Sequence, residues 1–290
     1  MNQLRDIRLQ ILVDNISLDD TLKAEHGFSC LIETGGHRVL FDTGAKTAIA
    51  DNCRSLGVNL QCLDALVFSH GHYDHTGGLS AIDGRFSAKR IIGHPNIFGS
   101  HYSRRTGSNR DIGMPNATRD MLDRHPCVLS AFPIEVVEGV WTTGEIPRVT
   151  SSRNSTYLFA DSMGLQPDNV PDDVALVLRH KAGLVLLLGC AHAGVTDTLR
   201  AVSRQFPNKP IVGIVGGMHL DGADAELIRQ VVGALRDSPV LFVAPAHCTG
   251  DAAKQVLQAA FGQRCLVAHA GMTLTIDDTG RFLSGTSSAR

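Results

Sequence analysis

The chain has 290 residues, of which 43% are apolar and 19% are charged, and its net charge at pH 7 is −2. This composition is typical of a globular protein, and the charge provides no basic excess that would favour nucleic acid or an anionic membrane as a partner. The longest apolar runs, such as Leu184–Leu188, are far too short to span a bilayer. These numbers predict a protein that acts away from nucleic acid and membranes.

The seven cysteines are scattered along the chain, and no two of them are spaced as a CxxC pair. An odd number of scattered cysteines is typical of reduced thiols rather than of a disulfide framework. The N-terminal residues Met1 to Asp6 lack the apolar core of a secretory signal. We therefore expect a cytoplasmic protein.

The first part of the chain predicts a β-rich region. Two apolar runs joined by Gly35 and Gly36 are typical of a hairpin, because glycine adopts the positive φ angles that a tight turn requires. A helix is expected to end at Gly57. In chain order we expect strands over residues 8–13, 28–33 and 37–41, a helix over 46–56, and strands over 63–68 and 89–93.

Residues 99–127 have a different composition, with several basic side chains among glycine, serine and asparagine. The segment predicts an insertion or lid rather than part of a sheet. A solvated excursion is the simpler interpretation, but long polar loops beside a site are often functional. If this loop covers a site, its basic side chains would suit an anionic substrate. These side chains are His101, Arg104, Arg105, Arg110, Arg119, Arg124 and His125.

Alternating strands and helices are expected in the second half. The order predicts a layered α/β structure with helices on the outer faces of the sheets, and we expect one domain over residues 1–290. The expected strands cover residues 174–179, 184–188, 211–215, 240–244, 265–268 and 273–276, and the expected helices cover 195–206, 223–235 and 252–261.

The strand over residues 63–68 leads into a cluster of His70, His72, Asp74 and His75. Imidazole and carboxylate are the ligands that borderline divalent metals such as zinc prefer. The i, i+2 spacing of the first two histidines places both on one side of an extended backbone. A turn into a helix would direct Asp74 and His75 toward a second position nearby. One metal bound by each pair is the natural geometric interpretation, and a polar loop that is merely rich in histidine is the alternative.

This HxHxDH pattern resembles the signature of the metallo-β-lactamase superfamily. The resemblance implies a four-layer αβ/βα sandwich with a two-metal site at one edge. Asp42, in Phe41-Asp42-Thr43-Gly44, resembles the aspartate that hydrogen-bonds to a metal-binding histidine and fixes its tautomer. His247, after another apolar strand, resembles the last histidine ligand. The alternatives are a plain turn residue for Asp42 and a helix-capping residue for His247.

The chain departs from the superfamily pattern in two places. Cys190 stands where the usual bridging aspartate would be, and His192 follows two residues later. Either the Cys190 thiolate binds metal, or His192 is the ligand and Cys190 is a small buried residue. The usual third-motif histidine is also missing near Trp141, so that His192 or His94 would fill its place. An ordinary strand-end residue before a proline is the alternative for His94.

The chain contains five further motifs, at residues 24–29, 143–148, 189–194, 216–220 and 247–250. They are similar to those of the branch typified by 7,8-dihydropterin-6-methyl-4-(β-D-ribofuranosyl)aminobenzene-5'-phosphate synthase. The resemblance runs from about residue 8 to 276 and implies joining of a dihydropterin to an arylamine with loss of diphosphate. Polar residues in these motifs are candidates for binding substrate, although Glu25 could instead cap a turn and His219 could be a buried imidazole. The candidates are Glu25, His26, Glu145, Arg148 and His219.

The resemblance implies an enzyme with two divalent metals, most simply zinc, with manganese or iron open. One metal would be held by His70, His72 and His192, and the other by Asp74, His75 and His247. We expect hydrolysis of a small phosphorylated or ester-type substrate by a metal-bound hydroxide, with Asp74 orienting the nucleophile or carrying its proton. The alternatives are a dihydropterin diphosphate:arylamine transferase and a di-iron redox enzyme. The oligomeric state is left open.

Overall fold

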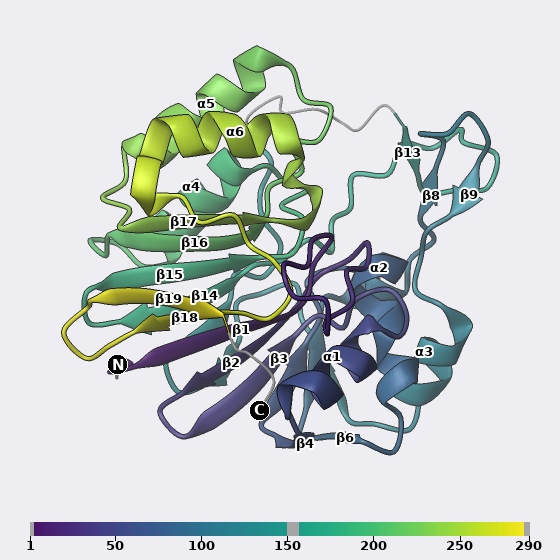
Figure 1. Ribbon diagram of the computed structural model, residues 1–290. Coiled ribbons are helices and arrows are strands. Elements are labelled where there is room, and N and C mark those ends of the chain that lie inside the picture. The colour runs from purple at the N-terminus through teal and green to yellow at the C-terminus, as the bar shows by residue number, and fades with distance from the viewer. Residues whose placement is uncertain (1–2, 150–156, 287–290) are drawn as a thin grey trace.

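The computed structural model describes residues 3–149 and 157–286. Met1 and Asn2 lie outside these residues; they belong to the segment Met1 to Asp6, for which no secretory signal was expected. Two large β-sheets pack face to face, and helices cover the outer face of each sheet (Figure 1). The order of layers is therefore αβ/βα, which confirms the predicted four-layer α/β sandwich.

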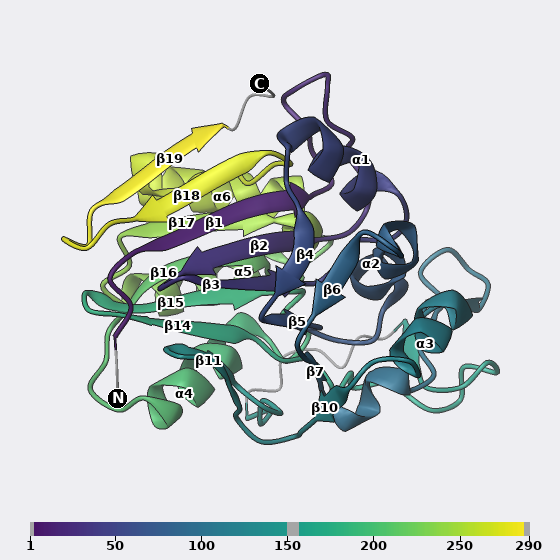
Figure 2. The same cartoon turned by 90° about the horizontal axis from the view of Figure 1, so that it is seen from below.

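The first sheet has eight strands. Its first four strands in space run parallel and the others antiparallel, and β18 and β19 extend the sheet beyond β1 (Figure 2). The helices on its outer face are α1 (Ala48–Leu56), α2 (Tyr73–Thr76), the 3₁₀ helix η1 (Gly77–Ile82) and α3 (Asn116–Leu122). In spatial order the strands are β10 (Cys127–Leu129), β7 (Ile91–Gly93), β5 (Ala65–Val67), β3 (His37–Phe41), β2 (Ser29–Thr34), β1 (Ile7–Val13), β18 (Met272–Ile276) and β19 (Phe282–Thr286).

The second sheet has six strands, and its last three run parallel. Parallel neighbours need a crossover connection, and helices supply it here. These are α4 (Val195–Gln205) and α5 (Ala225–Arg236). Helix α6 (Asp251–Phe261) follows the last strand of this sheet, and the three helices together cover its outer face. The strands are β11 (Glu135–Val137), β12 (Val140–Thr142), β14 (Leu176–His180), β15 (Gly183–Leu188), β16 (Ile211–Gly217) and β17 (Phe242–Ala246).

Smaller elements lie around the two sheets. Three short strands form an outlying sheet that projects from the sandwich in Figure 1. They are β8 (Tyr102–Ser103), β9 (Arg110–Asp111) and β13 (Leu158–Phe159). The remaining elements are the strand pair β4 (Leu60–Leu63) and β6 (Phe86–Ala88) and the 3₁₀ helices η2 (Pro95–Phe98), η3 (His247–Thr249) and η4 (Gly262–Arg264).

Strand β15 shows how the sequence specifies a buried layer. Val185 and Leu187 contribute to the core between the sheets, whereas Leu184, Leu186 and Leu188 contribute to the core beneath α4, α5 and α6. Both faces of the strand are therefore apolar, which gives a continuous hydrophobic run rather than an alternating one. Each such side chain stabilises the fold by about 1.5–3 kcal/mol on burial.

Most elements expected from the sequence are confirmed, including the β2–β3 hairpin, β14 to β17 and the three helices α4, α5 and α6. The strand expected over residues 63–68 is interrupted at Asp64, since β4 ends at Leu63 and β5 begins at Ala65. The Asp64 carboxylate accepts hydrogen bonds from the Arg38 N–H at 2.9 Å and from the Lys89 ammonium at 2.7 Å. These side-chain bonds compete with continuous strand pairing at this residue.

Two other strand expectations require correction. The strand expected over residues 89–93 begins only at Ile91. The strand expected over residues 265–268 is wrong, since Cys265 forms a single bridge with Val243 instead of a ladder. Strands β11, β12 and β19 were not expected, because each is short or only partly buried and has a weak apolar pattern.

Residues 99–127 were expected as an insertion or lid rather than part of a sheet, and in their second half only Cys127 lies in a large sheet. Helix α3 buries Met121 and Leu122 against the eight-stranded sheet, and Cys127 begins β10, which pairs with β7. Two buried apolar side chains anchor this helix although most of its neighbours in sequence are polar. Residues 102–111 do form an excursion, as strands β8 and β9.

The ends of several strands lie at one edge of the sandwich. Asp42 follows β3, His70 follows β5, Cys190 follows β15 and His247 follows β17. Polar side chains at the carboxyl ends of parallel strands meet at a common edge, which is where open α/β sheets place their ligand sites. Within residues 3–149 and 157–286, no helix combines the length and apolar character needed to cross a membrane.

The close approach of η1 to the Asp42 loop predicts that Gly78→Ala destabilises the protein. A Cβ atom at Gly78 would overlap the Thr43 carbonyl oxygen. We expect the free energy of unfolding, measured in urea, to fall by about 2–3 kcal/mol because the backbone must move. The control is Gly233→Ala in α5, where a Cβ atom would meet nothing within 4 Å. That substitution should stabilise by about 0.5–1 kcal/mol, and equal effects of the two would contradict the packing described.

Candidate metal centre

The histidine-rich loop is shaped by glycines and by its contact with Asp172. A Cβ atom at Gly71, between His70 and His72, would overlap the carbonyl oxygen of Ile97. The Gly71 N–H donates to Asp172 Oδ2 at 2.7 Å. The loop is therefore packed closely on both sides, and α2 begins immediately after it.

A buried aspartate sets the tautomers of two histidines. The Ser69 hydroxyl and the His75 Nδ1–H both donate to Asp42 Oδ2 at 2.7 Å, and the Ser69 N–H donates to Oδ1 at 2.7 Å. Since the Ser69 hydroxyl has given its proton to Asp42, its oxygen accepts from His70 Nδ1 at 2.8 Å. Both rings therefore keep the Nε2 lone pair free for another partner.

His70, His72 and His192 form the first group of donor atoms, which lie within 4.8 Å of one another. His70 Nε2 and His72 Nδ1 face each other at 3.0 Å. The carbonyl oxygen of His192 accepts a hydrogen bond from Arg148 Nη1 at 2.7 Å, which fixes the loop after β15. The His192 Nε2 atom is buried without a hydrogen-bond partner among the described residues.

A second group surrounds Asp74 Oδ2. The Nε2 atoms of His247, His75 and His26 lie 3.3, 3.9 and 3.2 Å from this oxygen. Asn15 Oδ1 accepts from His247 Nδ1 at 2.8 Å, so that His247 Nε2 carries a lone pair. The Asn15 amide nitrogen lies 3.4 Å from His26 Nδ1, which makes His26 Nε2 the donor toward Asp74.

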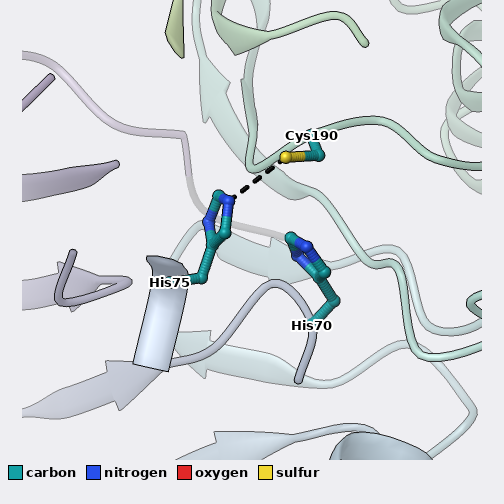
Figure 3. A group of neighbouring side chains, drawn as sticks. All are labelled: His70, His75 and Cys190. Atoms are coloured by element: carbon teal, nitrogen blue, oxygen red, sulfur yellow. Dashed lines mark hydrogen bonds between the residues drawn. The ribbon is translucent and has the colours of Figure 1, made fainter. Parts of the chain in front are cut away.

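Cys190 lies between the two groups. Its sulfur is 3.1 Å from His75 Nε2, and His70 completes a buried cluster of three donors (Figure 3). Burial raises the pKa of the Cys190 thiol well above its usual range, and the adjacent Cys248 adds to the effect. Although burial also raises the pKa of Cys248, the hydrogen bond from Cys190 and the adjacent His247 ring lower it well below its usual range. Cys248 is therefore the more acidic thiol of the pair.

The imidazoles of the first group are held neutral. Burial lowers the pKa of His70 and of His192 well below the usual value, and neighbouring histidines lower it further. Burial and the adjacent His101 lower the pKa of His72 to about 3. Neutral imidazole is the form that binds metal ions, so no proton has to be displaced at neutral pH.

Backbone strain is concentrated at the strand ends that form the centre. Asp42, Ala191, His219 and His247 have φ angles of 58, 54, 49 and 42°. Positive φ is uncommon for residues other than glycine and is tolerated mainly where the surroundings impose it, often at functional sites.

The other residues expected to bind substrate are placed differently. Glu25 accepts backbone N–H groups of Ala45 and Lys46 at 3.0 and 2.9 Å, so its carboxylate caps the loop before α1. Glu145 is exposed, and its Oε2 lies 3.6 Å from His94 Nε2, while His94 Nδ1 accepts the Asn96 N–H.

His26 and His219 do lie at the centre. They line a pocket of about 340 Å³ together with His247 and Cys248. The His219 ring lies 4.3 Å from the His192 ring, and its Nε2 is 3.1 Å from the Tyr157 hydroxyl. Arg148 contacts the centre through the His192 carbonyl oxygen.

Several residues of the centre were not predicted as part of it, although His101 was expected in the lid-like segment. His101 Nδ1 is 2.6 Å from Asp168 Oδ2, and the His101 ring lies 4.9 Å from the His72 ring. Asn15 and Cys248 also contact donor residues. Cys248 follows His247 directly and was available as a signal, whereas Asn15 and His101 lie in segments with no metal-ligand spacing.

The donor set fits divalent metals such as zinc. It combines neutral imidazoles, a carboxylate and thiols, and buried nitrogens of His72, His192 and His247 have no hydrogen-bond partner among the described residues. Buried polar atoms normally have partners, so these are positions where a ligand is expected. Zinc prefers this mixture of nitrogen, oxygen and sulfur donors.

The family model of the metallo-beta-lactamase superfamily matches residues 22–195, and the chain belongs to this superfamily. A 7,8-dihydropterin-6-methyl-4-(beta-D-ribofuranosyl)-aminobenzene-5'-phosphate synthase of Methanocaldococcus jannaschii is 29% identical over 261 residues, which cover 86% of this chain and 89% of the relative. This confirms the resemblance to that branch.

Two solved structures are similar to the whole chain. Tm1679, described as a metal-dependent hydrolase of the beta-lactamase superfamily, has a TM-score of 0.80 and 28% identity, covering 97% of this chain and 99% of its own. Zn²⁺-bound PqqB from Methylobacterium extorquens has a TM-score of 0.56 and 15% identity, covering 92% and 99%. The second likeness concerns the fold alone.

The hydrogen bonds of Asp42 predict that Asp42→Asn weakens metal binding. The asparagine would retain the size of the side chain but would lose one acceptor for Ser69 and His75. We expect the affinity for zinc, measured by competition with a chromophoric chelator, to fall about 10- to 100-fold. Asp83→Asn, at an exposed position, is the control and should leave the affinity unchanged. Equal affinities of all three proteins would show that Asp42 does not support the metal centre.

Proposed function

We propose that this chain is a metal-dependent hydrolase with two divalent metals, most simply zinc, acting on a small phosphorylated or ester-type substrate. The observation that carries the proposal is the convergence of two adjacent donor groups from several strand ends. Each group contains nitrogen atoms that have no hydrogen-bond partner in the part of the chain that the structure describes. The superfamily membership and the likeness to Tm1679 support hydrolysis.

The two donor groups would hold one metal each. His70, His72 and His192 would bind the first metal, and Asp74, His75 and His247 would bind the second. Cys190 is the candidate for a shared ligand, since its sulfur lies within 4.8 Å of donor atoms of both His70 and His75. When bound, the metals would supply Lewis acidity toward a carbonyl or phosphoryl oxygen and an activated water molecule.

The residues of the chain would orient the nucleophile and hold its proton. Burial raises the pKa of Asp74, but the imidazoles of His75, His247 and His26 outweigh this effect and hold the pKa well below its usual range. Asp74 is therefore ionised at neutral pH and can accept a hydrogen bond from the attacking water molecule. His26, which is partly exposed and donates to Asp74, is suited to contact the substrate.

A second candidate function is transfer of a dihydropterin from diphosphate to an arylamine. The similarity to the Methanocaldococcus jannaschii 7,8-dihydropterin-6-methyl-4-(beta-D-ribofuranosyl)-aminobenzene-5'-phosphate synthase favours this function. Transfer requires that water be kept from the reacting atoms. Arg105, in the expected lid, donates to Asp221 at 2.5 Å, and both residues line the pocket, an arrangement that suits such exclusion.

The ligand assignment predicts that His72→Ala and His247→Ala each abolish activity toward phosphate and carboxylate esters. Each substitution removes one nitrogen ligand, so the metal content measured by elemental mass spectrometry should fall as well. His37→Ala, at the start of β3 and away from the centre, is the control and should keep its metal and activity. Unchanged metal content in the first two variants would rule out the assignment.

The two candidate functions predict different products from the same incubation. With a dihydropterin methyl diphosphate and an arylamine, a hydrolase should release the free pterin alcohol, because water attacks. A transferase should yield the coupled product and diphosphate. Product analysis by liquid chromatography and mass spectrometry separates the two, and coupled product as the main species would contradict hydrolysis as the principal activity.

A further inference from the structure

A pocket opens beside the second donor group and extends toward the first turn of α6. It has a volume of about 340 Å³ and is lined by His26 and His247 of the centre. Gly250, Asp251 and Lys254, at the start of α6, line the same pocket. A substrate whose reacting group lies at the donor residues would therefore reach α6 with another part of its structure.

Lys254 is a buried lysine that lines this pocket. Its side chain and backbone are only 5% exposed, and among residues 3–149 and 157–286 its ammonium group has no hydrogen bond or ion pair. Asp14 is close enough for an electrostatic interaction, but its two oxygens already accept the N–H groups of Ile16 and His247, at 3.0 and 2.9 Å. Asp14 therefore offsets part of the Lys254 charge without hydrogen-bonding to the ammonium group, whose N–H groups are left for an anion in the pocket.

The N-terminus of α6 adds a second feature that favours an anion. The helix has 11 residues, its N-cap is Gly250, and no side chain caps it. Gly250 has φ +76°, and a Cβ atom there would lie 2.7 Å from the Asp221 Cα, which prevents a larger capping residue. The first N–H groups of the helix and its positive dipole end are therefore left for a ligand.

The acidic residues of the pocket do not neutralise the positive charge of Lys254 or of the α6 N-terminus. Asp221 is paired with Arg105 at 2.5 Å, and Arg105 also lies 5.6 Å from the centre of the Tyr157 ring. Asp251 is exposed, so its charge is screened by water more strongly than that of the buried Lys254.

We propose that Lys254 and the first turn of α6 form a subsite that binds a phosphate group of the substrate. The proposal rests on the proposed function and narrows it to substrates that carry a phosphate away from the bond that is broken. Lys254 would contribute a charge-assisted hydrogen bond, and the helix N-terminus would contribute backbone N–H donors.

The test is a titration of the metal-loaded protein with inorganic phosphate, followed by ³¹P nuclear magnetic resonance. Lys254→Met should weaken phosphate binding about tenfold or more, because a charge-assisted hydrogen bond is lost. Lys254→Arg should remain within about threefold of the unsubstituted protein. Lys209→Met, at an exposed position, is the control and should bind phosphate unchanged.

An exposed substitution keeps the test informative if Lys254→Met does not fold. Asp251→Asn removes a negative charge from the same helix turn and should tighten phosphate binding about twofold. Unchanged binding in a folded Lys254→Met protein, or in Asp251→Asn if the former does not fold, would overturn the subsite. Absence of phosphate binding in the unsubstituted protein would overturn it as well.

Metal content measured on the same samples tests the proposed function separately. A protein that lacks metal but binds phosphate through Lys254 would contradict the proposed hydrolase and leave the subsite standing. A protein with its metals and with phosphate binding independent of Lys254 would leave the hydrolase standing and overturn the subsite.

Discussion

The carboxylate of Asp42 is the constraint on which the candidate metal centre depends. It is fully buried at the end of β3 and accepts hydrogen bonds from the Ser69 backbone, the Ser69 hydroxyl and the His75 ring. These bonds join one strand to the loop that follows its parallel neighbour. They also set which nitrogen of His70 and His75 carries a proton, so a single carboxylate determines both the position and the chemical form of the donors.

The backbone conformation of the centre lowers the stability of the fold, and the apolar cores of the sandwich compensate for this loss. Four residues at its strand ends have positive φ, each at an estimated cost of about 1–3 kcal/mol, and several buried nitrogens have no hydrogen-bond partner among the described residues. The apolar cores between the four layers hold the strand ends rigid enough to impose these conformations. Bound metal would stabilise the native state, in which the donor residues are brought together, and would bind the nitrogen atoms that have no hydrogen-bond partner.

The sequence predicts the fold well where hydrophobic patterns are strong. The continuous run of β15 and the amphipathic pattern of α4 identify buried layers, and the HxHxDH spacing identifies the loop where the donors meet. Prediction fails where one side chain alters the backbone, as Asp64 does between β4 and β5. It also fails where a polar segment contains only two anchoring residues, Met121 and Leu122 in α3.

Part of the candidate site could not be predicted from the sequence for a different reason. His101, Asn15 and Lys254 come from three separate segments. His101 was expected only as a basic side chain of a lid, and nothing in the local sequence of the other two distinguishes them from solvent-exposed residues. They approach the donor residues only because the two sheets pack with their strand ends at one edge. Glu25 shows the reverse case, since a motif residue expected near substrate instead binds backbone N–H groups of the loop before α1.

The central claim is that the chain holds two divalent metals at the end of its sheets. Elemental mass spectrometry of protein purified without added metal or chelator measures both the identity and the number of the metals. The account predicts about two metals per chain, most simply zinc. One metal per chain would show that one donor group is not a metal position, and no metal even after reconstitution would contradict the account.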